Sequence, residues 1–222
     1  MHPERSSRRP ETVAPLGPAS ARQVVVPDRI VDDRFPGLRR MGVEMLALPV
    51  APLTKAGFAP FGEVIETADV KPKLINEGFA ERFDDLASID VAAEGGEVSV
   101  SVFIGAARPA PLVIKLMERH PLGSQLFMPL SGAPWLVVVC TDPGVPSSYR
   151  AFTASGRQGV NYARNCWHHP LLVVGEAGPF VVIDRKGAGS NLEERWLESA
   201  NWLRVAPDGA AEANSGITAK QG

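Results

Sequence analysis

The stretch GEVSVSVFI, residues 96–104, decides the fold class of this chain of 222 residues. Its apolar residues alternate with small or aromatic ones: Val98, Val100, Val102 and Ile104 are separated by Ser99, Ser101 and Phe103. A period of two sends successive side chains to opposite faces of a strand, whereas a helical face repeats about every 3.6 residues. The stretch is therefore predicted to be a half-buried β-strand.

Short apolar stretches of the same kind recur on both sides of it. They are residues 43–50, 54–66, 111–118, 124–130, 134–140, 149–154, 170–175 and 179–184. The chain's 21 glycines and 20 prolines separate them, and Thr54 is the expected N-cap of a single helical turn. Helical periodicity over three or more turns is nearly absent. The pattern predicts an all-β fold with few short helices, a sandwich or barrel, for which the cupin-type jelly-roll β-barrel is one solution.

Composition excludes several classes of function. Hydrophobic residues make up 45% and charged residues 22% of the chain, and 23 Lys and Arg balance 25 Asp and Glu. No basic patch or stripe favours nucleic acid, and no apolar run is long enough for a membrane span. The two cysteines, Cys140 and Cys166, form no disulfide pattern, which favours the cytoplasm.

The two ends of the chain differ from its middle. Residues 1–42 are rich in Pro, Arg and Ser without a steady period, and are expected to be disordered or a non-native extension, since Met41 or Met45 would make a natural start. Residues 204–222 are small and polar and are expected to form a flexible tail. A single barrel domain is predicted between them, over residues 43–203.

The segment ERHPLGSQLFMPLSG, residues 118–132, has the spacing of a cupin metal motif. Such a motif carries two ligands separated by one residue, then an acidic ligand, then a glycine; Glu118, His120, Gln125 and Gly132 occupy these positions. A histidine of WHHPL, residues 167–171, would be the fourth group. Imidazole and oxygen donors suit divalent transition metals. The alternative is a hydrogen-bonded polar lining without metal, in which every buried group must be paired.

His168 and His169 are adjacent, so in a strand their side chains point to opposite faces. Only one can enter the barrel. We favour His168, with the other histidine packed outside or on a partner. We expect His168 to converge with Glu118 and His120, and this grouping of titratable side chains favours a functional role for His168 over a structural one.

Substrate-binding candidates lie farther from these motifs. Arg82 could clamp a substrate carboxylate in a bidentate pair, although a solvated surface is the alternative. Asn76 and Tyr162 are the other candidates beside Gln125. Cys166 is expected to be a small buried thiol, because a nucleophilic thiolate needs an activating base.

Three stretches in order and spacing resemble the ureidoglycolate lyase family: INEGFAERFDDLA (75–87), MERHPLGSQLFMPLSG (117–132) and RAFTASGRQGVNYARNCWHHPL (150–171). The resemblance implies a cupin-type barrel, a homodimer, and cleavage of (S)-ureidoglycolate to glyoxylate and urea in allantoin breakdown. It also implies a divalent metal, with nickel suspected, a small ureido acid as substrate, and no organic cofactor.

For this activity we predict proton transfer or metal ligation by His120 and His168, with Glu118 as ligand or base. Gln125, a further candidate metal ligand, would orient the ureido group, and Arg82 would hold the carboxylate.

The chain departs from the family pattern at two places. Asp84 stands where the family usually has a histidine, and Ile104 where relatives tend to have an arginine. These departures leave two alternatives open: a cupin-fold lyase or hydrolase for another small ureido or hydroxy acid, and a non-catalytic carboxylate sensor.

Overall fold

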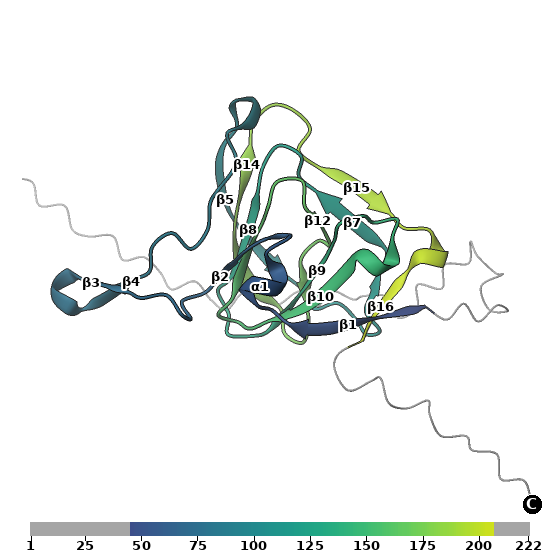
Figure 1. Cartoon of the computed structure of the whole chain (residues 1–222), viewed down its shortest axis with the longest axis horizontal. Helices are drawn as coiled ribbons and strands as arrows, with labels where there is room; N and C mark the ends of the chain where they lie inside the picture. Colours follow the sequence, from purple (N-terminus) through teal and green to yellow (C-terminus); the bar gives the residue numbers. More distant parts are fainter. Residues whose placement is uncertain (1–44, 207–222) are drawn as a thin grey trace, which may run out of the picture. The chain divides into compact units, whose positions relative to one another are not determined.

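The computed structural model describes residues 45–206, in which two β-sheets share a core (Figure 1). The larger sheet has the order β15 (Glu193–Trp196), β7 (Leu116–Arg119), β12 (Trp167–His168), β9 (Trp135–Cys140), β10 (Tyr149–Ala154), β1 (Leu46–Pro52), β16 (Leu203–Ala206) and β6 (Val113–Ile114), with β13 (Leu172–Val173) also paired to β9. The second sheet has the order β2 (Gly62–Ile65), β11 (Gly159–Tyr162), β8 (Gln125–Pro129), β14 (Gly178–Lys186) and β5 (Glu97–Gly105).

The remaining elements are short. A two-stranded hairpin pairs β3 (Lys73–Ile75) with β4 (Ala80–Arg82) around the 3₁₀ turn η1 (Asn76–Gly78). The helical pieces are α1 (Lys55–Phe58), η2 (Ala93–Gly95), η3 (Pro146–Ser148) and η4 (Ser199–Asn201). The predicted all-β, cupin-type barrel with few short helices is confirmed. The predicted cap is confirmed too, because Thr54 Oγ1 accepts a hydrogen bond from the Gly57 amide at 3.1 Å.

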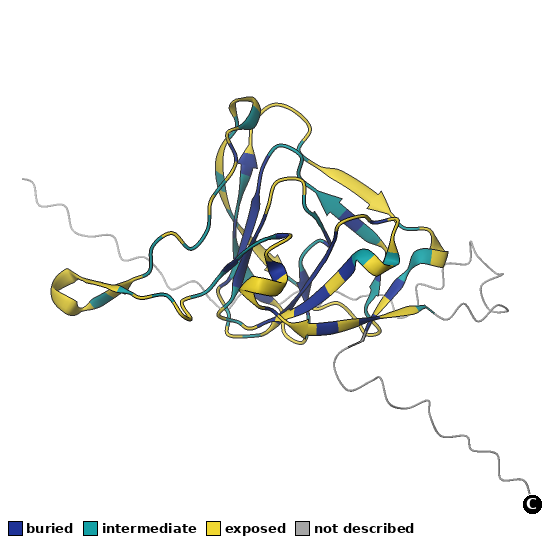
Figure 2. Ribbon diagram, in the orientation of Figure 1, coloured by how far each residue is buried: buried dark blue, intermediate teal, exposed yellow. Residues whose placement is uncertain are grey.

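The core lies between the two sheets and continues behind the larger one. All six residues of β9 are buried: Val137 and Val139 face Phe127 and Phe180 of the second sheet, and the opposite face of β9 packs in a second cluster. Burial is concentrated in the central strands, while the edge strands β5 and β15 are largely exposed (Figure 2). A strand covered on both faces reads as a continuous apolar run, which explains the sequence WLVVVC.

Strand β5 is formed as predicted, but its valine face points outward. Phe103, on the other face, packs against Phe127 with ring centroids 5.9 Å apart, and Val100 is 69% exposed. An alternating strand ordinarily buries its more apolar face.

The predicted terminal segments lie mostly outside the described residues. Nothing in the structure bears on residues 1–42, while residues 204–206 belong to β16, where Val205 is buried. The last strand of the barrel thus extends beyond the predicted boundary at residue 203. Within residues 45–206 there is no helix long and apolar enough to span a membrane.

Gly156 is required by a close approach of two backbone segments. A Cβ atom there would lie 2.1 Å from the carbonyl carbon of Gly132, whereas a Cβ at Gly132 would meet nothing within 4 Å. We expect Gly156→Ala to lower the free energy of unfolding by about 1–3 kcal/mol, because backbone must shift to relieve the overlap. Urea denaturation would measure this. Gly132→Ala is the matched control and should stay within about 0.5 kcal/mol of the parent protein; equal losses would contradict the explanation.

Candidate active site

Four polar side chains from the two sheets converge at one end of the barrel. Glu118 on β7 pairs in register with His168 on β12, and Gln125 begins β8 of the second sheet. His168 Nε2 lies 3.1 Å from Gln125 Oε1 and 3.4 Å from Glu118 Oε1. The ring of His120 lies 5.3 Å from that of His168, centroid to centroid. The structure therefore brings together the four residues predicted as metal ligands.

His120 is held by the segment that precedes β15. Its Nδ1 lies 2.7 Å from the carbonyl oxygen of Asn191, and Asn191 Oδ1 accepts a hydrogen bond from the Leu122 amide. A carbonyl only accepts, so Nδ1 carries the proton and Nε2 presents a lone pair. Nε2 is buried without a hydrogen-bond partner among the described residues. A buried imidazole nitrogen in this state is suited to bind a cation or a proton donor.

The ring of His168 is oriented like that of His120, with Nδ1 toward a backbone carbonyl. Its Nδ1 lies 3.0 Å from the carbonyl oxygen of Cys166, so Nε2 faces the two oxygens of Glu118 and Gln125. Tyr162 stacks beneath the ring, with centroids 4.0 Å apart and planes 13° from parallel. Three acceptors facing one another repel unless a proton or a metal ion lies between them.

Charges within the cluster follow from these contacts. Burial disfavours ionisation of Glu118, but the hydrogen bond and Coulombic attraction from His168 outweigh it, so the pKa of the carboxyl lies below its ordinary value. Burial and repulsion from His168 lower the pKa of His120. An anionic carboxylate thus stands beside a neutral imidazole at pH 7. Ligand atoms of Glu118, His120 and His168 all lie within 4.8 Å of one another, and this donor set fits a divalent transition metal.

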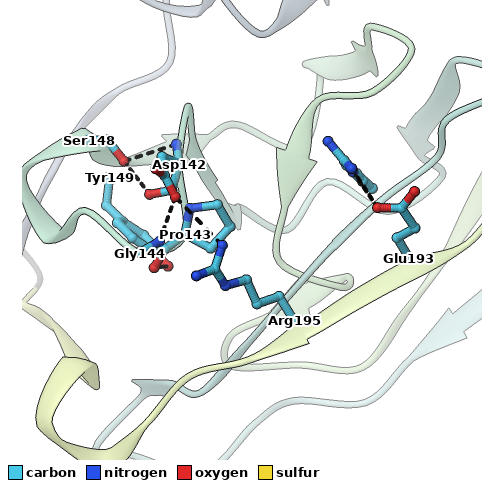
Figure 3. A network of polar contacts seen from close by, with 8 residues as sticks. Asp142, Pro143, Gly144, Ser148, Tyr149, Glu193 and Arg195 are labelled. Carbon is cyan, nitrogen blue, oxygen red and sulfur yellow. Dashed lines mark hydrogen bonds and ion pairs between the residues drawn. The ribbon is translucent and has the colours of Figure 1, made fainter.

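Strand β15 supports the strand that carries Glu118. It pairs with β7, and the two strands are joined by an ion pair of 2.6 Å between Arg119 and Glu193. Farther along, Arg195 reaches the turn at Asp142, 3.7 Å away (Figure 3). The side chain of Arg119 also lies over the ring of Trp167, 4.6 Å from its centroid. Arg119 thus stabilises the outside of the site.

A pocket of about 490 Å³ opens beside the cluster. Its lining includes Glu118, Gln125, Phe103, Ile104 and Arg108. Arg108 was missed by the sequence reasoning. It is exposed, its amide donates to the carbonyl of Val173, and no ion pair involves it among the described residues. One signal was available: Arg108 is the only cationic residue between Gly105 and Ile114.

Two predicted substrate-binding residues lie away from this pocket in the same chain. Asn76 and Arg82 belong to the β3–β4 hairpin, which stands off the barrel in Figure 1, and Arg82 forms an ion pair with Asp84. Tyr162 is buried beneath His168 instead of lining the pocket. It therefore supports the imidazole ring.

The side chains of the remaining candidates, partly buried Cys166 and buried His169, bond to backbone carbonyls and not to the cluster. Burial raises the pKa of the Cys166 thiol to about 12, as expected of an inert thiol. His169 is buried within its own chain. Its amide donates to the carbonyl of Val138, and burial lowers its pKa to about 4.

Together, the two-sheet barrel and the Glu-His-His-Gln cluster beside its pocket define a cupin-type protein. The family model for ureidoglycolate lyase matches residues 45–204, and the chain belongs to that family.

Relatives and solved structures give the following similarities. The chain is 51% identical over 166 residues to ureidoglycolate lyase 1 of Rhizobium meliloti, covering 74% of this chain and 96% of the relative. It is 51% identical to ureidoglycolate lyase of Burkholderia mallei, covering 72% and 94%. A structure from a study of the Mn(II) centres of Bacillus subtilis oxalate decarboxylase matches with 15% identity, covering 47% of this chain and 29% of that protein. Its TM-score of 0.30 is too low to support a conclusion.

Proposed function

We propose that this protein is a ureidoglycolate lyase, which eliminates urea from (S)-ureidoglycolate and releases glyoxylate in allantoin breakdown. The observation that carries the proposal is the pocket in which Arg108, Glu118 and Gln125 line one cavity next to the unpartnered Nε2 of His120 and to Nε2 of His168, which faces Gln125. The family match spans both motifs that build this cavity.

The reaction requires three groups. Ureidoglycolate is a carbinolamide with a carboxylate; its C–N bond breaks when the hydroxyl loses a proton, the glyoxylate carbonyl forms, and the urea nitrogen gains a proton. Water is not consumed. The site must therefore hold the carboxylate, accept a proton at the hydroxyl and deliver one at the nitrogen, and each positioned acid or base typically contributes about 10²–10⁴-fold.

The chain's own residues supply these roles as follows. The guanidinium of Arg108 binds the substrate carboxylate. Glu118, ionised because of its lowered pKa, accepts the hydroxyl proton and, once protonated, delivers it to the departing urea nitrogen. Gln125 orients the ureido group through its side-chain amide, and Phe103 and Ile104 form apolar walls of the pocket.

Glu118, His120 and His168 would hold a divalent metal, with Gln125 beside them. The fit rests on the unpaired Nε2 of His120 and on the three facing acceptors. A bound metal would supply Lewis-acid polarisation that makes the hydroxyl more acidic. Nickel and manganese are the two ions to test first, and no organic cofactor is needed for this elimination.

Arg108 provides a direct test of carboxylate binding. Arg108→Ala is expected to raise KM for ureidoglycolate by about 10- to 100-fold with a smaller change in kcat, because the charged contact exists in both ground and transition states. Steady-state kinetics of glyoxylate release would measure both constants. Arg157→Ala, in an exposed turn, is the matched control. An unchanged KM in Arg108→Ala would remove Arg108 from the site.

The activity itself is tested by incubating the purified protein with racemic ureidoglycolate and following glyoxylate above the spontaneous rate. Release that stops at half conversion would support the lyase, since one enantiomer is consumed.

Ile104, at a position where relatives tend to carry an arginine, lines the pocket. The second candidate, an enzyme for another small ureido or hydroxy acid, rests on this departure, and the absence of release would favour it over the lyase. Binding without turnover would favour the carboxylate sensor.

We also propose that the enzyme is a cytoplasmic homodimer. Both cysteines are free in the described structure, in keeping with a reducing compartment. The outward valine face of β5 supports self-association, because large exposed apolar patches usually mark interfaces.

A further inference from the structure

The β3–β4 hairpin, residues 73–82, is called the arm here. Its strands pair only with each other, and Figure 1 shows it standing off the barrel. Leu74 is 69% exposed and Phe79 is 90% exposed. A two-stranded hairpin is marginally stable alone in water, so an arm with apolar side chains at its end needs a surface to pack on.

The outward face of β5 is an unpartnered surface of matching chemistry. Val98, Val100, Val102 and Ile104, here called the stripe, are between 49% and 72% exposed and lie on one face. In the sheet, β5 pairs only with β14, so its other edge is free among the described residues. A long apolar edge strand without a covering element is a site for pairing with another chain.

Exposed apolar side chains are concentrated on these two elements. Of thirteen large apolar side chains that are exposed in the described part of the chain, eight lie on the arm or on β5. In a single chain the arm and the stripe are both exposed, so the arm does not cover the stripe of its own chain. Ile104 ends the stripe and also lines the pocket beside Glu118. Whatever covers the stripe therefore reaches the mouth of the candidate active site.

We propose that the arm of one copy packs on the stripe of a second copy, reciprocally across a two-fold axis, and closes the mouth of the partner's pocket. A two-fold contact is made twice, so the seven apolar side chains of arm and stripe count in both copies. At roughly 60–100 Å² for each side chain, they bury about 800–1,400 Å². Stable interfaces bury about 1,200–2,000 Å² in total, so the two contacts with their polar surroundings suffice for a dimer.

The arrangement gives the arm a role in the reaction. Water is excluded from the pocket only when the partner's arm lies over Ile104 and Arg108, which strengthens the pairing of Arg108 with the substrate carboxylate. This catalytic consequence rests on the proposed lyase function. The contact between arm and stripe does not depend on that function, so a failed contact and a failed lyase function can be told apart.

The contact is tested first by oligomeric state. Analytical ultracentrifugation of the full chain should give a dimer for the parent protein, and monomers for Phe79→Asp and Val100→Asp, because each buries a charge in the interface. Both positions are exposed, so the circular dichroism spectra of the variants should match that of the parent protein. Val145→Asp, an exposed apolar residue in another turn, is the matched control and should remain dimeric. A monomeric parent protein, or dimeric Phe79→Asp and Val100→Asp variants, would overturn the contact.

Completion of the site in trans is tested by mixing two inactive variants. Phe79→Asp keeps its site but lacks a functional arm, while His120→Ala keeps its arm but lacks a catalytic imidazole. Phe79→Asp does not pair with itself, whereas a mixed dimer keeps one of its two arm contacts and one complete site, so we expect activity only in the mixture, at no more than half that of the parent protein. No recovery, with mixed dimers shown by native mass spectrometry, would overturn completion in trans. Inactivity of the parent protein itself would instead count against the lyase function.

Discussion

Replacing His120 with alanine is expected to lower kcat for glyoxylate release by at least about 100-fold while changing the unfolding midpoint little. The reason is the state of the imidazole. Its Nε2 is buried and without a partner among the described residues, so removing it costs no hydrogen bond there, and only the Nδ1 contact to Asn191 is lost. Rates over a substrate series and a thermal melt would measure the two effects.

The control for this prediction is the histidine next to the site. His169→Asn removes an imidazole that is more deeply buried than His120 and bonds to the Pro170 carbonyl and not to the cluster. Its kcat should stay within about 10-fold of the parent protein, below the contribution of one positioned acid or base. Comparable losses in both variants would mean that the effect is structural, and a fully active His120→Ala protein would contradict the role of His120.

Strand content and the cupin frame could be predicted because they depend on local pattern. Three features can be recognised in the sequence itself: the alternation in residues 96–104, the continuous apolar run of β9 and the Thr54 cap. Strand β15 could not be read in this way. Its sequence EERW is exposed and polar, and only its pairing with β7 makes it a strand.

The two histidines show why local pattern has limits at the site. Alternation separates His168 from His169, but it does not say what covers the second face. Strand β12 lies between β7 and β9, and residues of the second core cluster pack behind this sheet, so both histidines are buried. Arg108 was missed for a related reason: it sits in a loop, and only the bridge between Ala107 and Val173 brings it to the pocket.

Removing metal should lower the rate of glyoxylate release about as strongly as the replacement of His120 with alanine. Dialysis of the purified protein against EDTA is expected to reduce glyoxylate release to the spontaneous rate, and added manganese or nickel should restore it. The physical reason is the facing lone pairs of His120, His168 and Glu118, which stay close only with a cation between them. Metal content by mass spectrometry should fall with activity and return with it.

Glu118→Gln helps to distinguish a cluster that holds a metal ion from a cluster that holds a proton between the same side chains. The amide keeps the shape of the carboxylate but loses its charge, so a metal site should lose both metal content and turnover. A cluster without metal would satisfy the same contacts with a proton between His168 Nε2 and the oxygens of Glu118 and Gln125. In that case EDTA would leave activity intact, Glu118→Gln would still abolish it by removing the base, and the dependence of kcat/KM on pH would report the free carboxylate. Turnover that survives both EDTA and Glu118→Gln would place the chemistry outside this cluster.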